Sequence, residues 1–321
     1  MRYLLLEEVN LDWILFFKET IGVSLLIPWL LLRWYQGRLL YISKRLIFYI
    51  LIAAVICQLI GSHLQLLGYA VIGLIISVPL IQSSTLLGVA ILGAVFLGDP
   101  LSKKRQYAVA VLITAVTILS IGKALIEPVS PQPETVLNPS LFLLAAAGAV
   151  LAGLSFSVYT IILRYVIRRY WKDEDSPWKS FSFRHWAGSE YKEQGKNSTG
   201  SRFYSPFPVT LLAAIVLGAG VIIFGTCLYA GHGASGFVNV PPFAWYLIPI
   251  SAVCNAVGFF FQIQGLRMTT AVQASLVAVA QIILLSFVGY LYFDEAVNSI
   301  VIFGLVLTSY GVIISAKPEN S

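Results

Sequence analysis

Polar side chains recur at helical spacing within a segment that is otherwise apolar. Gln58, Ser62, Gln65 and Tyr69 stand at i, i+4, i+7 and i+11, which places them on one face of a helix. Amide and hydroxyl groups both donate and accept hydrogen bonds, so a row of them can bind a polar solute. This stripe is the first candidate for a binding surface.

Other apolar segments carry polar positions of the same kind. Ser77 and Thr85 share a helical face with Ile81. The remaining candidates for a shared cavity are Tyr159, Asn255, Gln262, Gln273 and Gln281. Polar groups are costly inside a membrane, so their placement on several segments predicts a common interior cavity. Such groups also join packed helices through hydrogen bonds. For a single Ser or Thr we favour packing, and for the glutamines both interpretations stay open.

Lys18 is the only cation within an apolar segment of the sequence, and Glu19 follows it. Lys18 could bind an anionic group of a substrate or take part in proton coupling. It could instead extend its side chain to the outer interface, and we favour this interpretation slightly. Because adjacent residues do not share a helix face, a direct Lys18–Glu19 pair is not expected.

Other titratable residues point more weakly to function. His63 could relay protons, although a lone histidine near a helix end is more often structural. Asp99 and Glu295 belong to turns, where acidic residues favour helix N-termini, and we expect them to be caps. The three histidines lie far apart in sequence, and neither H-E-x-x-H nor a phosphate-binding G-x-x-x-x-G-K-[ST] motif occurs. The sequence therefore favours neither an enzyme nor a metal or cofactor site.

The composition indicates where such residues must be placed. Of the 321 residues, 58% are hydrophobic and 11% are charged, whereas about a quarter are charged in soluble domains. The apolar runs suit helices that cross about 30 Å of hydrocarbon, and they are too long for barrel strands. The predicted fold class is all-α, a polytopic helical membrane bundle. Its nine predicted spans are 11–33, 46–68, 71–97, 106–124, 140–164, 207–231, 243–266, 270–293 and 297–316.

The basic residues predict an orientation for these spans. One set of alternate loops holds 18 of the 21 Lys and Arg residues, and the opposite set holds only Arg2 and Lys123. Basic loops mark the cytoplasmic side, so the formal net charge of +6 does not indicate a nucleic-acid partner. We expect a cytoplasmic C-terminus, an external N-terminus and a place in the plasma (inner) membrane.

An internal repeat relates the two parts of the chain. The stretches 94–102 and 290–298 each end a span in a short acidic turn, and at an offset of 196 residues the halves align without a gap from about 63 to 118. The charge pattern places the turn of Asp99 inside and that of Glu295 outside. The two halves are therefore predicted to be inverted repeats, an architecture typical of secondary transporters.

These features resemble the EamA repeat of the drug/metabolite transporter superfamily. The likeness is strongest from Thr269 through Phe293-Asp294-Glu295 to Gly311, and it extends over nearly the whole chain. The resemblance implies two inverted repeats of five helices each, of which this sequence has about four and five. The first span, with Phe17-Lys18-Glu19, stands where the family has its second helix, so the family's first helix is expected to be missing here.

The repeats define the predicted organisation of the chain. The first repeat occupies 1–124, an external linker 125–139 and the second repeat 140–316, with a cytoplasmic loop at 165–206 and a cytoplasmic tail at 317–321.

The resemblance implies a secondary transporter, an exporter of small metabolites that works by alternating access. Expected partners are the lipid bilayer and a small-molecule substrate, and a coupling ion and a homodimer are left open. A non-transporting scaffold or a truncated transporter remnant is the alternative, and a membrane-embedded enzyme is the least favoured interpretation.

Overall fold

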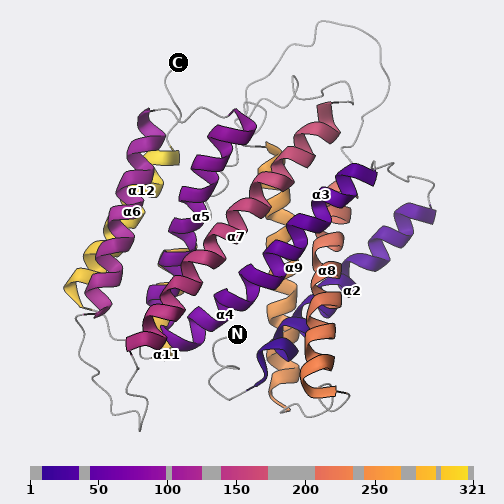
Figure 1. Ribbon diagram of the computed structural model, residues 1–321, viewed down its shortest axis with the longest axis horizontal. Coiled ribbons are helices and arrows are strands. Elements are labelled where there is room, and N and C mark those ends of the chain that lie inside the picture. The colour runs from indigo at the N-terminus through magenta and orange to yellow at the C-terminus, as the bar shows by residue number, and fades with distance from the viewer. Residues whose placement is uncertain are drawn as a thin grey trace, which may run out of the picture.

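A computed structural model describes residues 9–35, 44–98, 103–124, 139–172, 207–233, 242–268, 280–293 and 298–316 (Figure 1). All regular structure in these ranges is helical, which confirms the all-α prediction for them. The elements are α2 (Leu11–Tyr35), α3 (Lys44–Val55), the π-helix η1 (Ile56–Ser62), α4 (His63–Val71), α5 (Leu74–Leu97), α6 (Lys103–Ala124), α7 (Pro139–Lys172), α8 (Phe207–His232), α9 (Ala244–Met268), α11 (Ala280–Phe293) and α12 (Ser299–Ala316).

Six helical segments among the described residues are long and apolar enough to cross a membrane. They are Leu11–Leu32, Lys44–Val71, Leu74–Leu97, Ser140–Arg168, Thr210–His232 and Ala244–Leu266. Shorter apolar helices occur at Gln106–Ala115, Leu284–Phe293 and Ser299–Gly311. Each of these segments coincides with one of the nine predicted spans. The coincidence indicates an integral membrane protein, as expected from hydropathy.

Helix α7 is longer than predicted. It continues to Lys172, so residues 165–172 of the predicted loop are helical. Val166 and Ile167 are buried there, and the Arg168 side chain donates a hydrogen bond to the Leu97 carbonyl oxygen at 3.1 Å. Apolar burial and this contact stabilise the extra turns. The rest of the predicted loop, the linker apart from Pro139 and the tail 317–321 lie outside the described residues.

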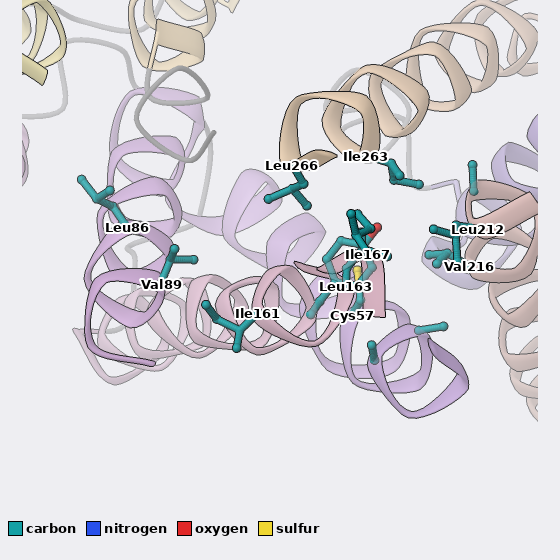
Figure 2. Close-up of a cluster of buried hydrophobic side chains, with 14 of the residues drawn as sticks. Cys57, Leu86, Val89, Ile161, Leu163, Ile167, Leu212, Val216, Ile263 and Leu266 are labelled. Carbon is teal, nitrogen blue, oxygen red and sulfur yellow. The ribbon is translucent and has the colours of Figure 1, made fainter. Parts of the chain in front are cut away.

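Small residues allow α7 to pack closely on α5. A Cβ atom at Gly88 would lie 2.7 Å from the Cβ of Ser157, and one at Gly153 would lie 2.9 Å from the backbone nitrogen of Thr85. Closely packed membrane helices use small residues in this way. Figure 2 shows Ile161 of α7 facing Leu86 and Val89 of α5.

Two further contacts complete the bundle. Helices α6 and α12 lie side by side at one edge in Figure 1, and Gly311 of α12 lies so close to Leu112 that a Cβ atom there would be 2.8 Å away. At the other edge α2 packs along α8, where a Cβ atom at Gly225 would lie 3.0 Å from the Phe16 ring. The core therefore extends between these pairs through α5 and α7.

The chain direction alternates as the predicted spans require. Arg168 of α7 reaches Leu97 at the end of α5, and Arg164 donates to the Leu266 carbonyl oxygen near the end of α9. The ends of these three helices thus lie at one end of the bundle, which we call the arginine end. At the opposite end, Asn10 before α2 contacts His232 at the end of α8. Which end faces the cytoplasm remains a prediction.

The π-helix η1 interrupts one otherwise continuous span. It joins α3 to α4 and brings Gln58 and Ser62 into the interior, where both are buried. Gly61 within it lies against the Phe156 ring of α7, only 2.7 Å from where a Cβ atom would be. A π-helix is rare and often marks a functional site.

Candidate functional site

The most unusual residue in the interior is Glu19 of α2. It is an acidic residue well inside the apolar span Leu11–Leu32, and its side chain is 0% exposed. The Lys18 Nζ atom lies 2.8 Å from Glu19 Oε1, and the Lys18 side chain is 13% exposed. The expectation that these neighbours do not pair is wrong, because the lysine stem is long enough to bring the ammonium group to the carboxylate. The ammonium group is directed to Glu19 and not to an interface.

Only one Glu19 oxygen is satisfied. Asn255 of α9 donates a long hydrogen bond to Oε1 at 3.5 Å, whereas Oε2 is buried and has no hydrogen-bond partner among the described residues. A buried acceptor without a donor is costly. The site can therefore accept a hydrogen-bond donor or a proton at this oxygen.

Gln58 of η1 and Glu19 of α2 both lie against Gly220 of α8. Its Nε2 donates to the Val216 carbonyl oxygen at 3.4 Å, and its Oε1 accepts a hydrogen bond from Ser62 at 2.9 Å. A Cβ atom at Gly220 would lie 2.9 Å from Glu19 Cγ and 3.0 Å from Gln58 Nε2. The glycine thus lets α8 approach both polar groups. We call Lys18, Glu19, Gln58, Ser62 and Asn255 the buried polar centre.

Tyr159 of α7 borders the buried polar centre. It is 1% exposed, and its hydroxyl has no hydrogen-bond partner among the described residues. Its ring meets Phe259 of α9 edge-on, with centroids 6.2 Å apart. Tyr159 and Cys57 both lie within electrostatic range of Glu19. A second buried polar group without a hydrogen-bond partner among the described residues therefore lies within electrostatic range of Glu19.

An apolar layer separates this centre from the arginine end. Figure 2 shows Leu163 and Ile167 of α7 beside Cys57, between residues of α8 and α9. The α8 and α9 members of the layer are Leu212, Val216, Ile263 and Leu266. These side chains make the interior apolar between the buried polar centre and that end.

A different set of residues borders the centre toward the opposite end. His63 Nε2 of α4 lies 2.7 Å from Asp12 Oδ1 of α2, and the two side chains are 24% and 26% exposed. The His63 ring lies 5.1 Å from the Phe224 ring of α8, and its Nδ1 has no hydrogen-bond partner among the described residues. Asp12 precedes Glu19 by two turns on the same face of α2. The side of the centre toward Asp12 and His63 is therefore polar, whereas the side toward the arginine end is apolar.

The other predicted site residues are placed differently. Gln65 donates to the Tyr69 hydroxyl oxygen at 2.6 Å, so these two satisfy each other. Thr85 bonds the Ile81 carbonyl oxygen at 2.7 Å, and Ser77 bonds that of Gly73, both within α5.

Three predicted glutamines stay untested as cavity residues. Gln262 is exposed on α9. Gln273 and the side chain of Gln281 lie outside the described residues, as do the predicted caps Asp99 and Glu295. The structure thus brings together Lys18, Gln58, Ser62 and Asn255, with Tyr159 beside them.

Sequence reasoning missed Glu19 and the pairing of Asp12 with His63. The signal that could have found them is the i, i+7 spacing of two carboxylates in one apolar span, since an acidic residue at membrane depth needs a partner.

The fold and the buried ion pair are those of a helical integral membrane protein. No protein-family model matches the chain, and no curated protein matches it. A crystal structure of a protein with 13% sequence identity aligns with 95% of this chain and 87% of its own, at a TM-score of 0.58. At this identity the likeness extends to the fold alone.

Proposed function

We propose that the chain is a secondary transporter, an exporter of small metabolites that works by alternating access between two inverted halves. The observation that carries the proposal is the buried polar centre, because charged residues at membrane depth typically mark solute or ion pathways. The centre lies near the middle of its helices, where transporters bind their solutes.

The packing of the helices supports two related halves. The offset of 196 residues takes Leu11 to Phe207, the first residues of α2 and α8, and it relates α3–α4 to α9, α5 to α11 and α6 to α12. The contacts between helices follow this correspondence between the two halves. Helix α2 packs on α9 as α8 packs on α3, and α5 packs on α6 as α11 packs on α12. The pairs α2–α8, α5–α11 and α6–α12 each join corresponding helices.

The two borders of the centre suggest how access would alternate. Glu19 is bordered by the apolar layer toward the arginine end, and by Trp13, Phe17 and the Asp12–His63 pair toward the other end. Opening either border alone would connect the centre to one side of the membrane. Rocking of one half against the other does this in transporters with inverted repeats.

The experiment combines ligand screening with transport. Purified full-length protein is screened for small metabolites that raise its melting temperature, since a ligand that binds the folded state stabilises it. Each hit is then measured for flux in proteoliposomes. We expect Glu19→Gln to abolish flux and Asn255→Ala to lower it about tenfold, as expected for the loss of one hydrogen bond.

Cys254→Ala is the matched control, because Cys254 precedes Asn255 on α9 but is exposed. It should leave flux unchanged. A folded wild-type protein that moves none of the compounds that stabilise it would contradict transport and favour the scaffold alternative.

A further inference from the structure

Titratable side chains form a row from one end of the bundle to its centre. His63 contacts Asp12 at the end, and Glu19 lies on the same face of α2, about 10 Å further along the axis. The helix α4 that carries His63 continues from η1, whose Ser62 and Gln58 extend the polar row to Gly220 beside Glu19. The arginine side of the centre carries the apolar layer instead.

The two carboxyl oxygens of Glu19 have different surroundings. As a carboxylate it is held by Lys18 at Oε1, but its buried Oε2 has no donor. A proton on Oε2 would neutralise the group and weaken the ion pair, and Lys18 would keep its own proton. The centre would then gain one positive charge. A buried charge that loses its partner is strongly unfavourable, so protonation must change the packing around Lys18.

Among the residues that the structure describes, few titratable groups face this pair. Glu19 faces Lys18 on its own helix, Cys57 on η1 and Tyr159 on α7, while α8 presents Gly220 and α9 the neutral amide of Asn255.

His63 faces Asp12 on α2 and the Phe224 ring on α8. Cys227 of α8 lies within electrostatic range of Asp12. Lys18 is thus the only cation that contacts Glu19 in the described part of the chain.

We propose that Glu19 is a proton-exchange site that water reaches from the Asp12–His63 end, and that the proton is the coupling ion of the transporter. The coupling rests on the function proposed above. A proton from water is taken up by the His63 ring, which Asp12 orients. It then passes along the water to Glu19 Oε2, two helical turns further along α2, and the reverse transfer returns the proton to water and restores the ion pair.

A metal cation fits the same centre poorly. The Lys18 ammonium already occupies one Glu19 oxygen, and the described residues contain no group of three or more His, Cys, Asp or Glu side chains that could hold a metal. Hard cations take six or more oxygen ligands. A proton needs only the single free oxygen that is present.

Infrared difference spectroscopy tests the site without a substrate. The full-length protein is placed in lipid nanodiscs, which leave both ends open to water, and spectra are recorded as the pH is lowered. We expect a carbonyl band of a protonated carboxyl group in the wild type. The band should shift in Glu19→Asp and disappear in Glu19→Gln, but persist in Asp12→Asn.

The access route is tested by the rate at which the band forms after a rapid pH change. We expect His63→Gln to slow it about a hundredfold, the lower range of what a positioned acid–base group contributes. His232→Gln is the matched control at the same end of the bundle, and its rate should equal that of the wild type.

Each outcome decides the proposal. A wild type without a Glu19 band overturns the proton site, and an unchanged rate in His63→Gln overturns the route. The Glu19→Asp variant keeps the test valid if Glu19→Gln does not fold. Because no solute is involved, a Glu19 band in a protein that moves no solute would separate failure of transport from failure of the proton site.

Discussion

Helices α2 and α8 are related by the 196-residue offset, but their interiors differ in charge. Where α2 carries Lys18 and Glu19, α8 has Ala214 and Ile215. The two helices pack against each other, and Gly220 of α8 lies against Glu19 of the ion pair. The comparison teaches that the repeat of hydropathy builds the scaffold, whereas the buried ion pair belongs to only one helix of this related pair.

The helices that follow show the same contrast. Gln58 and Ser62 of η1 are buried, whereas their counterparts on α9, Cys254 and Gly258, are exposed. The π-helix has no equivalent at these positions of α9, which is α-helical throughout Ala244–Met268. One physical reason for a single buried ion pair is the desolvation cost of burying ions, which a second pair would double. The second half instead contributes Gly220, the Val216 carbonyl oxygen and the Asn255 amide.

The largest expected effect comes from removing one charge of the pair. Glu19→Leu or Lys18→Met alone should lower the free energy of unfolding by about 3–5 kcal/mol, because the remaining ion is buried without a partner. The double variant should recover most of this loss. At the corresponding site on α8, Ile215→Val should cost only about 1 kcal/mol. Denaturant unfolding in mixed micelles measures all four, and a double variant as unstable as the singles would mean that the charges act independently.

A smaller effect is expected from the α8 glycine that faces the pair. Gly220→Ala would place a methyl group against Glu19 and Gln58, and such overpacking costs about 1–3 kcal/mol. Gly218→Ala is its control on the same helix, since a Cβ atom there meets nothing within 4 Å. We expect that control to be neutral or stabilising by about 0.5–1 kcal/mol, the helix-propensity gain over glycine. Equal effects at the two glycines would mean that α8 does not approach the centre closely.

The link between Asp12 and His63 gives a third test of the comparison. Its counterpart positions on the second half are Pro208 and Phe259, which cannot form such a bond. Replacing His63 by Phe should therefore keep the packing against Phe224 and cost about 1 kcal/mol, the net value of one hydrogen bond. Thermal unfolding measures this loss of stability. The added substitution Asp12→Asn should cause little further loss, and an additive loss would show that the two residues are not coupled.

The fold could be predicted because membrane-length apolar runs dominate local preferences. The predicted span 297–316 corresponds to α12 (Ser299–Ala316), and 207–231 corresponds to α8 (Phe207–His232). The end of α7 was predicted too early, because hydropathy falls at Arg164 and Arg168 although both side chains bond to neighbouring helices. Hydropathy cannot reveal such contacts.

The site could be predicted only in part, for two physical reasons. The stripe from Gln58 to Tyr69 was assigned with the α-helical period, but η1 changes the period within it, so the stripe divides into a buried Gln58–Ser62 pair and a separate Gln65–Tyr69 pair. The Lys18–Glu19 contact was rejected from the directions of adjacent side chains. That argument neglects the length of the lysine stem, and it overlooks how strongly a buried carboxylate attracts a cation.

The smallest effects should come from the predicted cavity residues on α5. Ser77 and Thr85 already donate their hydroxyl groups to carbonyl oxygens one turn earlier in the same helix. Ser77→Ala and Thr85→Val should therefore change the free energy of unfolding by less than about 0.5 kcal/mol, the range of a substitution without special contacts. Flux should stay at the wild-type level in both, whereas Gln58→Leu should lower it, since Gln58 alone of the three borders Glu19 through Gly220. If Ser77→Ala lowers flux as much as Gln58→Leu, the solute pathway extends along α5 and the chemistry of the molecule is not confined to α2 and η1.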